Sequence, residues 1–152
     1  MIAETKIGRG DNAHDYYLRI NPSILEDESE IHRTEPYVYA QMISGPRAVR
    51  QGEAKNSWLT GAASWNYVAI CQYILGVRPD FDGLRIESVF PKSWKGFSVS
   101  RAFRGVNYHI AVERVGPENH VEIEVDGHPI QGNIVAAPDT GAADVNVVVQ
   151  VS

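Results

Sequence analysis

The chain has 152 residues, 43% of them hydrophobic and 22% charged, which allows a folded domain with a core and excludes a disordered or fibrous chain. Its formal net charge of -5 removes the basic surface that binding to a phosphate backbone requires, so we expect no nucleic-acid partner. The longest apolar run is too short to span a bilayer, and residues 1–10 lack the apolar stretch of a signal peptide. These features predict a cytoplasmic protein with no membrane partner.

The first part of the chain carries the end signals of helices. Gly8 predicts the end of a short helix, and Asp11 predicts the N-cap of a second helix over residues 12–20 that stops before Pro22. About two turns before Gly8 are too few for a stable isolated helix, so we expect Met1 to interrupt a longer one. The acidic residues 24–30 predict a solvated loop, because no histidine pair frames them at metal-ligand spacing.

Two further helices are expected before residue 79. Pro36 suits a first helical turn and predicts a third helix as far as Gly45, followed by a polar loop over residues 47–57. The fourth helix, over residues 61–75, is apolar nearly all round and therefore needs protein on several sides. Four such helices cannot cover one another within residues 1–78, so we expect this half to be a piece of a larger helical structure.

The second half has the alternating pattern of β-strands separated by turn residues. The predicted turns are a strong hairpin at Asp126-Gly127 and a weaker one at Arg104-Gly105. Helices followed by strands predict an α+β chain of two packed domains, the second an antiparallel sandwich. The predicted strands cover residues 84–88, 97–103, 107–115, 121–125 and 145–151.

Polar side chains near the helix starts are the candidates for chemistry. Thr60-Gly61 opens the fourth helix, where a hydroxyl and free N–H groups serve either as an ordinary N-cap or as a binding site for an oxyanion. Gln41 lies among apolar neighbours and needs a polar partner. Two alternatives stay open: His32 and Arg33 bind a sugar or an anion, or Arg33 forms an ion pair with Glu35.

The tryptophans and histidines leave further alternatives. Trp58 and Trp94 are either packing residues or sugar platforms, and Trp58 lies close to Thr60. No pair of histidines has metal-ligand spacing, so we expect no metal, and no nucleotide-binding glycine motif predicts a cofactor.

Three long motifs stand out: IHRTEPYVYAQMI at residues 31–43, GEAKNSWLTG at residues 52–61 and ILGVRPDFDGL at residues 74–84. In this order they resemble the C-terminal part of glycoside hydrolase family 94, a family of inverting glycoside phosphorylases. The resemblance implies that residues 1–78 are the last helices of an (α/α)6 catalytic barrel and that residues 79–152 are a small C-terminal β domain.

The resemblance also implies a reaction and its site. In the family, inorganic phosphate attacks the anomeric carbon while an aspartic acid protonates the leaving oxygen, and no other cofactor is needed. By similarity, Gln41, Thr60 and Gly61 bind phosphate. The aspartic acid belongs to an upstream motif that this sequence does not contain, so we expect no catalytic residue in the chain and no turnover by the chain alone.

The expected whole enzyme converts a β-linked glucose disaccharide such as cellobiose, with phosphate, into α-glucose 1-phosphate and glucose. The motif around Trp58 is closer to the cellobiose branch of the family than to the chitobiose branch. The expected partners are the disaccharide or an oligosaccharide, phosphate and the N-terminal part of the enzyme, and homodimers are common in the family. The alternative is a stand-alone carbohydrate-binding or assembly module that uses the β half and aromatic residues such as Trp94.

Overall fold

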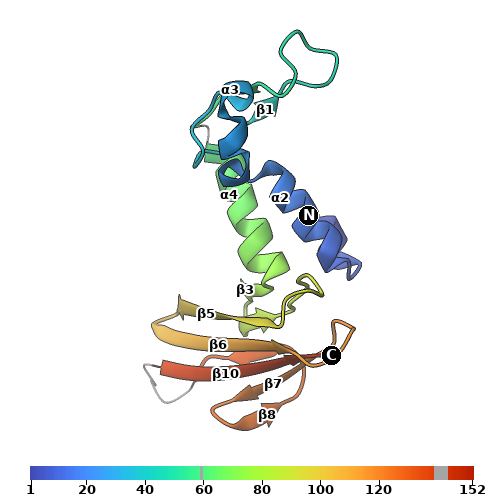
Figure 1. The fold of residues 1–152 in the computed structure, drawn as a ribbon. Helices are drawn as coiled ribbons and strands as arrows, with labels where there is room; N and C mark the ends of the chain where they lie inside the picture. The colour runs from blue at the N-terminus through green and yellow to red at the C-terminus, as the bar shows by residue number, and fades with distance from the viewer. Residues whose placement is uncertain (59, 139–143) are drawn as a thin grey trace.

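The computed structural model describes residues 1–58, 60–138 and 144–152. Helices and short connections form the first half, and strands form the second, with α4 running between the two (Figure 1). The elements of the first half are α1 (Ile2–Lys6), α2 (Gly10–Ile20), the 3₁₀ helix η1 (Pro22–Glu28), α3 (Ser29–His32), β1 (Met42–Ile43), β2 (Ala54–Lys55), α4 (Thr60–Ala69) and the π-helix η2 (Ile70–Ile74). Those of the second half are β3 (Val77–Pro79), β4 (Gly83–Ile86), β5 (Gly96–Phe103), β6 (Val106–Arg114), β7 (Val121–Val125), β8 (His128–Ile130), β9 (Ile134–Ala136) and β10 (Asp144–Val151).

The second and fourth predicted helices are present, with changes at their ends. α2 begins at Gly10, and its N-cap is Arg9 instead of the predicted Asp11. The Asp11 carboxylate instead accepts a hydrogen bond of 2.9 Å from the backbone N–H of Lys92, which ties the start of α2 to the β half. α4 continues into η2, and together they cover residues 60–74, nearly the predicted span. A π-helical turn that extends an α-helix is frequent at functional sites.

The predictions for residues 24–45 were wrong. The expected acidic loop is the 3₁₀ helix η1 followed by α3, although most of its side chains are exposed. The expected third helix is absent from residues 36–45, which instead lead into β1. β1 pairs antiparallel with β2, with Met42 opposite Lys55 and Ile43 opposite Ala54. A strand of two residues carries no hydrophobic period, so the sequence pattern could not reveal this ladder.

All five predicted strands are present, and both predicted hairpin turns are confirmed. Arg104-Gly105 joins β5 to β6 and Asp126-Gly127 joins β7 to β8, with positive φ at both central residues of each turn. This is the backbone that a two-residue hairpin turn of type I′ requires. The short strands β3, β8 and β9 were not predicted.

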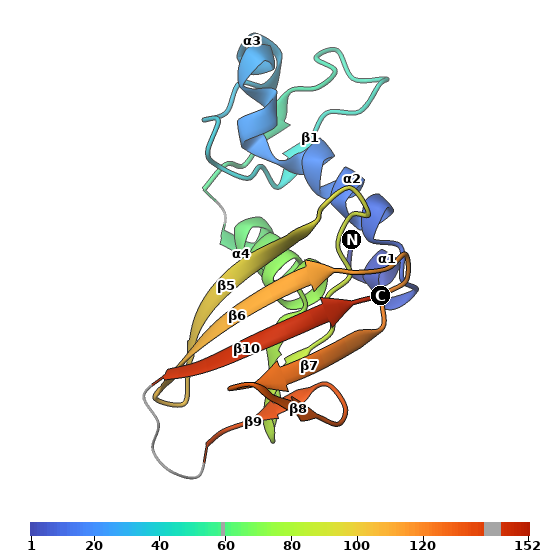
Figure 2. The same ribbon diagram turned by 60° about the horizontal axis from the view of Figure 1, so that its bottom comes forward.

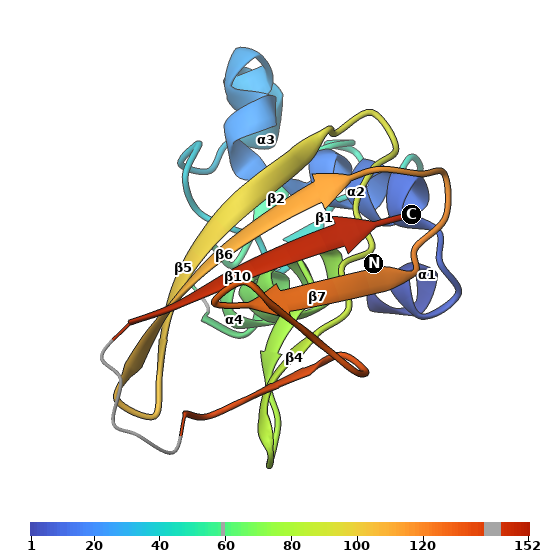
Figure 3. The same ribbon diagram turned by 90° about the horizontal axis from the view of Figure 1, so that it is seen from below.

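The expectation of a purely antiparallel β half needs a correction. The larger sheet has the order β5-β6-β10-β7-β8, and β10 lies parallel to β6 while it pairs antiparallel with β7 (Figure 3). The second sheet, β3-β4-β9, is antiparallel. The parallel pair arises because β10 inserts between β6 and β7 instead of adding at an edge, which no local pattern specifies.

One hydrophobic cluster joins both sheets to the helices. Inward residues of β6 and β10 such as Tyr108 and Val149 pack with Leu84 of β4, Ile74 of η2 and Ala13 of α2. Figure 2 shows α1 and α2 beside the end of the larger sheet, near the C-terminus. The β half therefore fixes the position of the helices that precede it.

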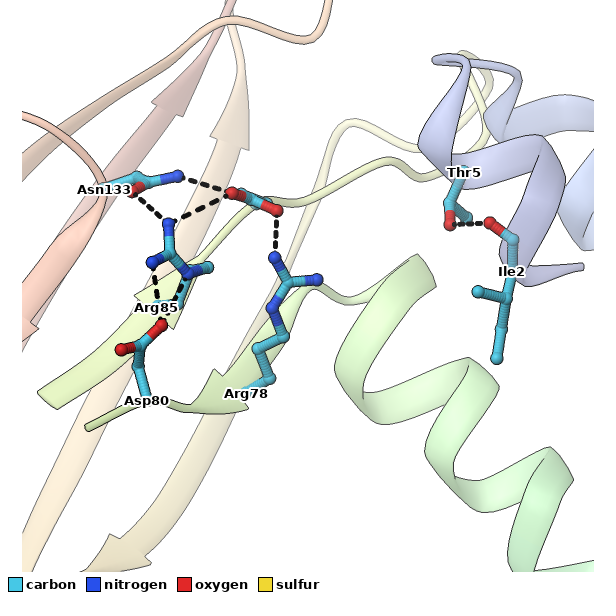
Figure 4. A network of polar contacts seen from close by, with 7 residues as sticks. Ile2, Thr5, Arg78, Asp80, Arg85 and Asn133 are labelled. Carbon is cyan, nitrogen blue, oxygen red and sulfur yellow. Dashed lines mark hydrogen bonds and ion pairs between the residues drawn. The ribbon is translucent and has the colours of Figure 1, made fainter.

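A polar network links β3, β4 and the segment before β9 (Figure 4). The Glu87 carboxylate accepts hydrogen bonds from Arg78 and from Asn133 Nδ2, the latter at 2.8 Å, and it lies 3.5 Å from Arg85 Nη1. Arg85 also donates through Nε to Asp80 at 2.8 Å, and this bond holds the pKa of the Asp80 carboxyl below its usual range.

Removal of the central acceptor in this network is expected to destabilise the chain. Glu87→Ala leaves the half-buried Arg78 and Arg85 without a shared carboxylate, so the free energy of unfolding should fall by about 2 kcal/mol. Glu87→Gln keeps an acceptor for Asn133 and should lose less. Urea unfolding followed by circular dichroism checks both variants, and equal stability of Glu87→Ala and the parent chain would contradict a stabilising role for the network.

The helical half exposes much apolar surface. The chain has an accessible surface of 9431 Å², whereas size scaling gives about 7,700 Å² for a compact monomer of 16.8 kDa, a difference of about 1,800 Å². The large exposed apolar residues of this half are Ile7, Tyr16, Leu18, Ile20, Ile24, Ile31, Tyr37, Met42, Ile43, Val49, Trp58, Trp65 and Tyr67. A difference of this size is about twice the roughly 800 Å² that one partner contributes to a standard protein interface.

Candidate functional site

The β1–β2 ladder brings the two predicted site segments together. Gln41 directly precedes β1, and the register, continued by one residue beyond Met42 and Lys55, places it beside Asn56. The Asn56 side chain donates to the sulfur of Met42 at 3.6 Å. Thr60 begins α4 four residues later, so Gln41 and the start of α4 lie at the same end of the ladder.

A second contact fixes the chain between the ladder and α4. The indole N–H of Trp58 donates to Glu35 Oε1 at 2.9 Å, across 23 residues of sequence. The rings of Tyr37 and Trp58 meet edge to face, with centroids 6.3 Å apart. The hydrogen bond from Trp58 holds the pKa of the Glu35 carboxyl below its usual range, and the Ser57 hydroxyl acts in the same direction.

The backbone of this turn is unusual. Asn56 has φ of 55° and Trp58 has φ of 67°. Asparagine tolerates this left-handed region, but a bulky residue such as tryptophan rarely adopts it and does so at a cost of about 1 to 3 kcal/mol. Such strain persists where surrounding contacts hold the residue in place, and it clusters at functional sites.

Positive charge gathers next to the ladder. Glu53, one residue before β2, lies 3.0 Å from Arg50 Nη1 and 3.8 Å from both Arg33 Nη1 and Lys55 Nζ. The hydrogen bond from Arg50 is the main reason that the pKa of the Glu53 carboxyl is lowered. Three cations around one carboxylate leave an excess of positive charge, which attracts anions to this part of the surface.

The predicted site residues have the exposure that a binding site needs. Gln41 and Gly61 are exposed, and a Cβ placed on Gly61 meets no atom within 4 Å, so there is open space at the helix start. The side chain of Thr60 lies outside the described residues. The first N–H groups of α4 have no partner within the helix and lie at the positive end of its dipole, an arrangement that suits phosphate or another oxyanion.

The other sequence predictions for polar residues need correction. Among the described ion pairs Arg33 contacts Glu53, not Glu35, because Glu35 is the acceptor for Trp58. His32 is buried. Trp94 is half-buried against His14 of α2 at 5.1 Å and Phe90 at 6.3 Å between ring centroids, so it is a packing residue at the junction of the two halves.

Sequence reasoning missed the tyrosine that anchors the Gln41 segment. Burial, together with a hydrogen bond to Tyr17 of α2, raises the pKa of Tyr39 to about 12. Tyr17 in turn accepts a hydrogen bond of 3.2 Å from Asn21 Nδ2. The one available signal was the spacing of Tyr37 and Tyr39, which fits an extended segment better than the helix that we expected.

The described residues contain neither a metal cluster nor a membrane-spanning helix. Within residues 1–58, 60–138 and 144–152, no three His, Cys, Asp or Glu side chains gather as a metal site needs. Over the same residues, every helix is too short or too polar to cross a bilayer.

Several known proteins with similar sequences are phosphorylases. Residues 1–76 match the family described as "Glycosyl hydrolase 94 superfamily, catalytic domain". The chain is 42% identical to the N,N'-diacetylchitobiose phosphorylase of Vibrio proteolyticus, over 97% of the chain and 18% of that protein. It is 44% identical to the enzyme of the same name from Vibrio furnissii, over 74% of the chain and 14% of that protein.

A third relative acts on another sugar. The solabiose phosphorylase of Paenibacillus borealis is 33% identical over 88% of the chain and 18% of that protein. The chain thus spans less than a fifth of the length of each of these three relatives.

Proposed function

The chain belongs to the glycosyl hydrolase 94 superfamily, and on this premise we propose that it is the C-terminal part of an inverting glycoside phosphorylase, in which it contributes to the phosphate site. The observation that carries the proposal is the β1–β2 ladder, which joins Gln41 to the turn before α4. The excess of cations around Glu53 supports an anionic ligand.

We propose that residues 1–78 supply the last helices of an (α/α)6 barrel and that residues 79–152 form the C-terminal β domain, a small sandwich. Three observations support this assignment: the exposed apolar residues of the helical half, the surface difference of about 1,800 Å², and the family match over residues 1–76. The division falls within β3, whose residues 77–79 pair with β4, so the two parts share a strand and a core. The N-terminal part of the enzyme is the partner that would cover the apolar faces.

In the proposed reaction, a phosphate oxygen attacks the anomeric carbon of the non-reducing sugar. The bond from that carbon to the glycosidic oxygen breaks, a bond to phosphate forms with inversion, and the leaving oxygen takes a proton from an acid. Gln41, Thr60 and Gly61 hold the phosphate, and the acid is an aspartic acid of the upstream part. Proton delivery contributes typically about 10²- to 10⁴-fold, so the chain alone should show no appreciable turnover.

The proposed substrate is a β-linked disaccharide. The motif around Trp58 favours cellobiose, whereas the two Vibrio relatives are phosphorylases of N,N'-diacetylchitobiose. Both sugars therefore belong in the assay. We further propose phosphate as the co-substrate without another cofactor, a cytoplasmic location, and a homodimer as in other members of the family.

A chimera tests the proposal. In it, this chain replaces the segment that it matches in the Vibrio proteolyticus enzyme, and release of sugar 1-phosphate is measured with each disaccharide. We expect phosphate-dependent cleavage by the chimera and none by the isolated chain. A folded chimera that fails to use phosphate, or an isolated chain that cleaves disaccharides at the rate of an ordinary enzyme, would overturn the proposal.

A further inference from the structure

The carboxylate of Glu35 holds Trp58, in the turn before α4. Trp58 donates to it through the indole N–H at 2.9 Å. No ion pair of Glu35 occurs among the residues that the structure describes, so the neutral indole is the side-chain donor that holds this carboxylate. Glu35 and Trp58 lie in two of the segments that form the candidate site.

Burial does not explain why Trp58 stays in a strained conformation. Its side chain is 64% exposed and its φ is 67°, so neither core packing nor backbone preference favours this arrangement. A hydrogen bond to a charged acceptor is among the stronger kinds and can offset such strain. The edge-to-face contact with Tyr37 adds to it.

The turn at Trp58 comes just before α4 in the chain. Trp58 lies two residues before Thr60, and a change of φ from the left-handed to the extended region at this position redirects everything that follows it. The N–H groups at the start of α4 can bind an oxyanion when they converge on one point. The contacts that hold the Trp58 backbone therefore also orient the N–H groups at the start of α4.

From these contacts we propose that Glu35 and Trp58 are a positioning pair for the phosphate site: the Glu35 carboxylate, by accepting the Trp58 N–H, keeps the turn left-handed and points the first amides of α4 at the phosphate. The proposal rests on the phosphate site proposed above. Neither residue touches phosphate in this arrangement. A negative charge this close to an anion site also repels the anion, so the charge of Glu35 strengthens the hydrogen bond from Trp58 but opposes phosphate binding directly.

The variants at Glu35 and Trp58 test the hydrogen bond. Trp58→Phe removes the donor and keeps a ring, and Glu35→Ala removes the acceptor, so each should weaken phosphate binding about tenfold, as expected for the loss of a hydrogen bond to a charged group. Glu35→Gln keeps a weaker, neutral acceptor and removes the repulsion, so its loss of phosphate binding should be smaller than that of Glu35→Ala. In the Glu35→Ala background, Trp58→Gly should restore binding, because glycine adopts positive φ without strain.

Trp65→Phe is the matched control. Trp65 is a tryptophan of α4 with 69% exposure, and its indole N–H has no hydrogen bond to the part of the chain that the structure describes. It should bind phosphate like the parent. A loss of binding in this control equal to that of Trp58→Phe would attribute the effect to aromatic surface and overturn the proposal.

The experiment titrates the 152-residue chain with inorganic phosphate and follows the amide of Gly61 and the indole N–H of Trp58 by ¹⁵N NMR. Amide hydrogen exchange of residues 60–62 without phosphate is the second measurement, and Trp58→Phe should accelerate it. Kinetics of the chimera are the third measurement. In the chimera, Trp58→Phe should raise KM for phosphate and leave KM for the disaccharide unchanged. If both Trp58→Phe and Glu35→Ala bind phosphate and exchange their amide hydrogens like the parent, the proposal of a positioning pair is overturned.

Failure of the pair and failure of the proposed function give different results. If the parent chain does not bind phosphate and the chimera does not use it, the proposed function fails. Amide hydrogen exchange still decides whether Glu35 and Trp58 hold the start of α4. If the parent binds phosphate and all variants bind equally, the function stands and the positioning pair is wrong.

Discussion

Gly76→Ala is expected to destabilise the folded chain severely. Gly76 follows the π-helix η2 and has φ of 73°, and a Cβ at this position would lie 2.1 Å from the carbonyl oxygen of Glu87. Atoms do not approach so closely, and backbone on both sides leaves no flexible end to move aside. The cost should exceed about 4 kcal/mol, a large share of the 5 to 15 kcal/mol that stabilises an ordinary domain.

The reason for this close approach is the junction between the helices and the sheets. The N–H of Glu87 donates to Gly76 O at 2.9 Å, and the fully buried Ser88 hydroxyl donates to Leu75 O at 2.8 Å. These bonds place the end of η2 directly against β4. A side chain at Gly76 would push the helical half away from the β half and disrupt the core that they share.

Gly105→Ala is the control that separates the steric clash at Gly76 from the cost of placing alanine at positive φ. Gly105 has φ of 80°, but a Cβ there meets no atom within 4 Å, so this variant suffers the cost of positive φ alone, about 1 kcal/mol. Urea unfolding followed by circular dichroism measures both variants. Similar, small losses for the two would show that η2 and β4 do not approach as the structure places them.

Thr60→Ala in the chimera is expected to lower kcat/KM for phosphate by about 10²-fold, the loss typical for one well-placed donor to a reacting anion. In the proposed site, the Thr60 hydroxyl donates to phosphate at the start of α4, where the helix dipole adds to the attraction. Because the proposed role of this hydroxyl is confined to phosphate, we expect KM for the disaccharide to stay the same. Initial rates at varied phosphate and fixed disaccharide measure the effect.

Thr60→Ser keeps the hydroxyl and is the matched control, and we expect it to stay within about threefold of the parent because the donor remains. Ser98→Ala removes an exposed hydroxyl of β5 and should change nothing. Parent-like kinetics in Thr60→Ala would remove this residue from the phosphate site, whereas an equal loss in Thr60→Ser would point to a packing role for the threonine methyl group.

The sequence predicted elements well wherever the signal is local. The alternation in β6 and β10 and the glycine turns at Arg104-Gly105 and Asp126-Gly127 each lie within a few consecutive residues, and all are confirmed. The helix over residues 36–45 was wrong because Pro36 and the apolar residues after it fit a helix locally, while pairing with β2, about a dozen residues later, decided the conformation. Local propensity yields to such tertiary contacts.

For the candidate site, the sequence predicted which segments take part, and the fold decided how these segments lie relative to one another. The motifs that contain Gln41 and Thr60 were visible from their resemblance to a family of phosphorylases. The hydrogen bond from Trp58 to Glu35 and the cations around Glu53 could not be predicted from the sequence. Each depends on how the fold brings together residues that are distant in sequence. Left-handed backbone at a tryptophan has no sequence signature at all.

The sequence by itself determined the division into a helical half and a β half, the two hairpin turns and the family, because periodicity, turn residues and motifs are properties of neighbouring residues. The tertiary structure alone decided that β10 lies parallel to β6 between two earlier strands and that the β1–β2 ladder unites the two motifs. Backbone hydrogen bonds are the same for every sequence, so the choice of partner strand depends on burial and packing over the whole chain.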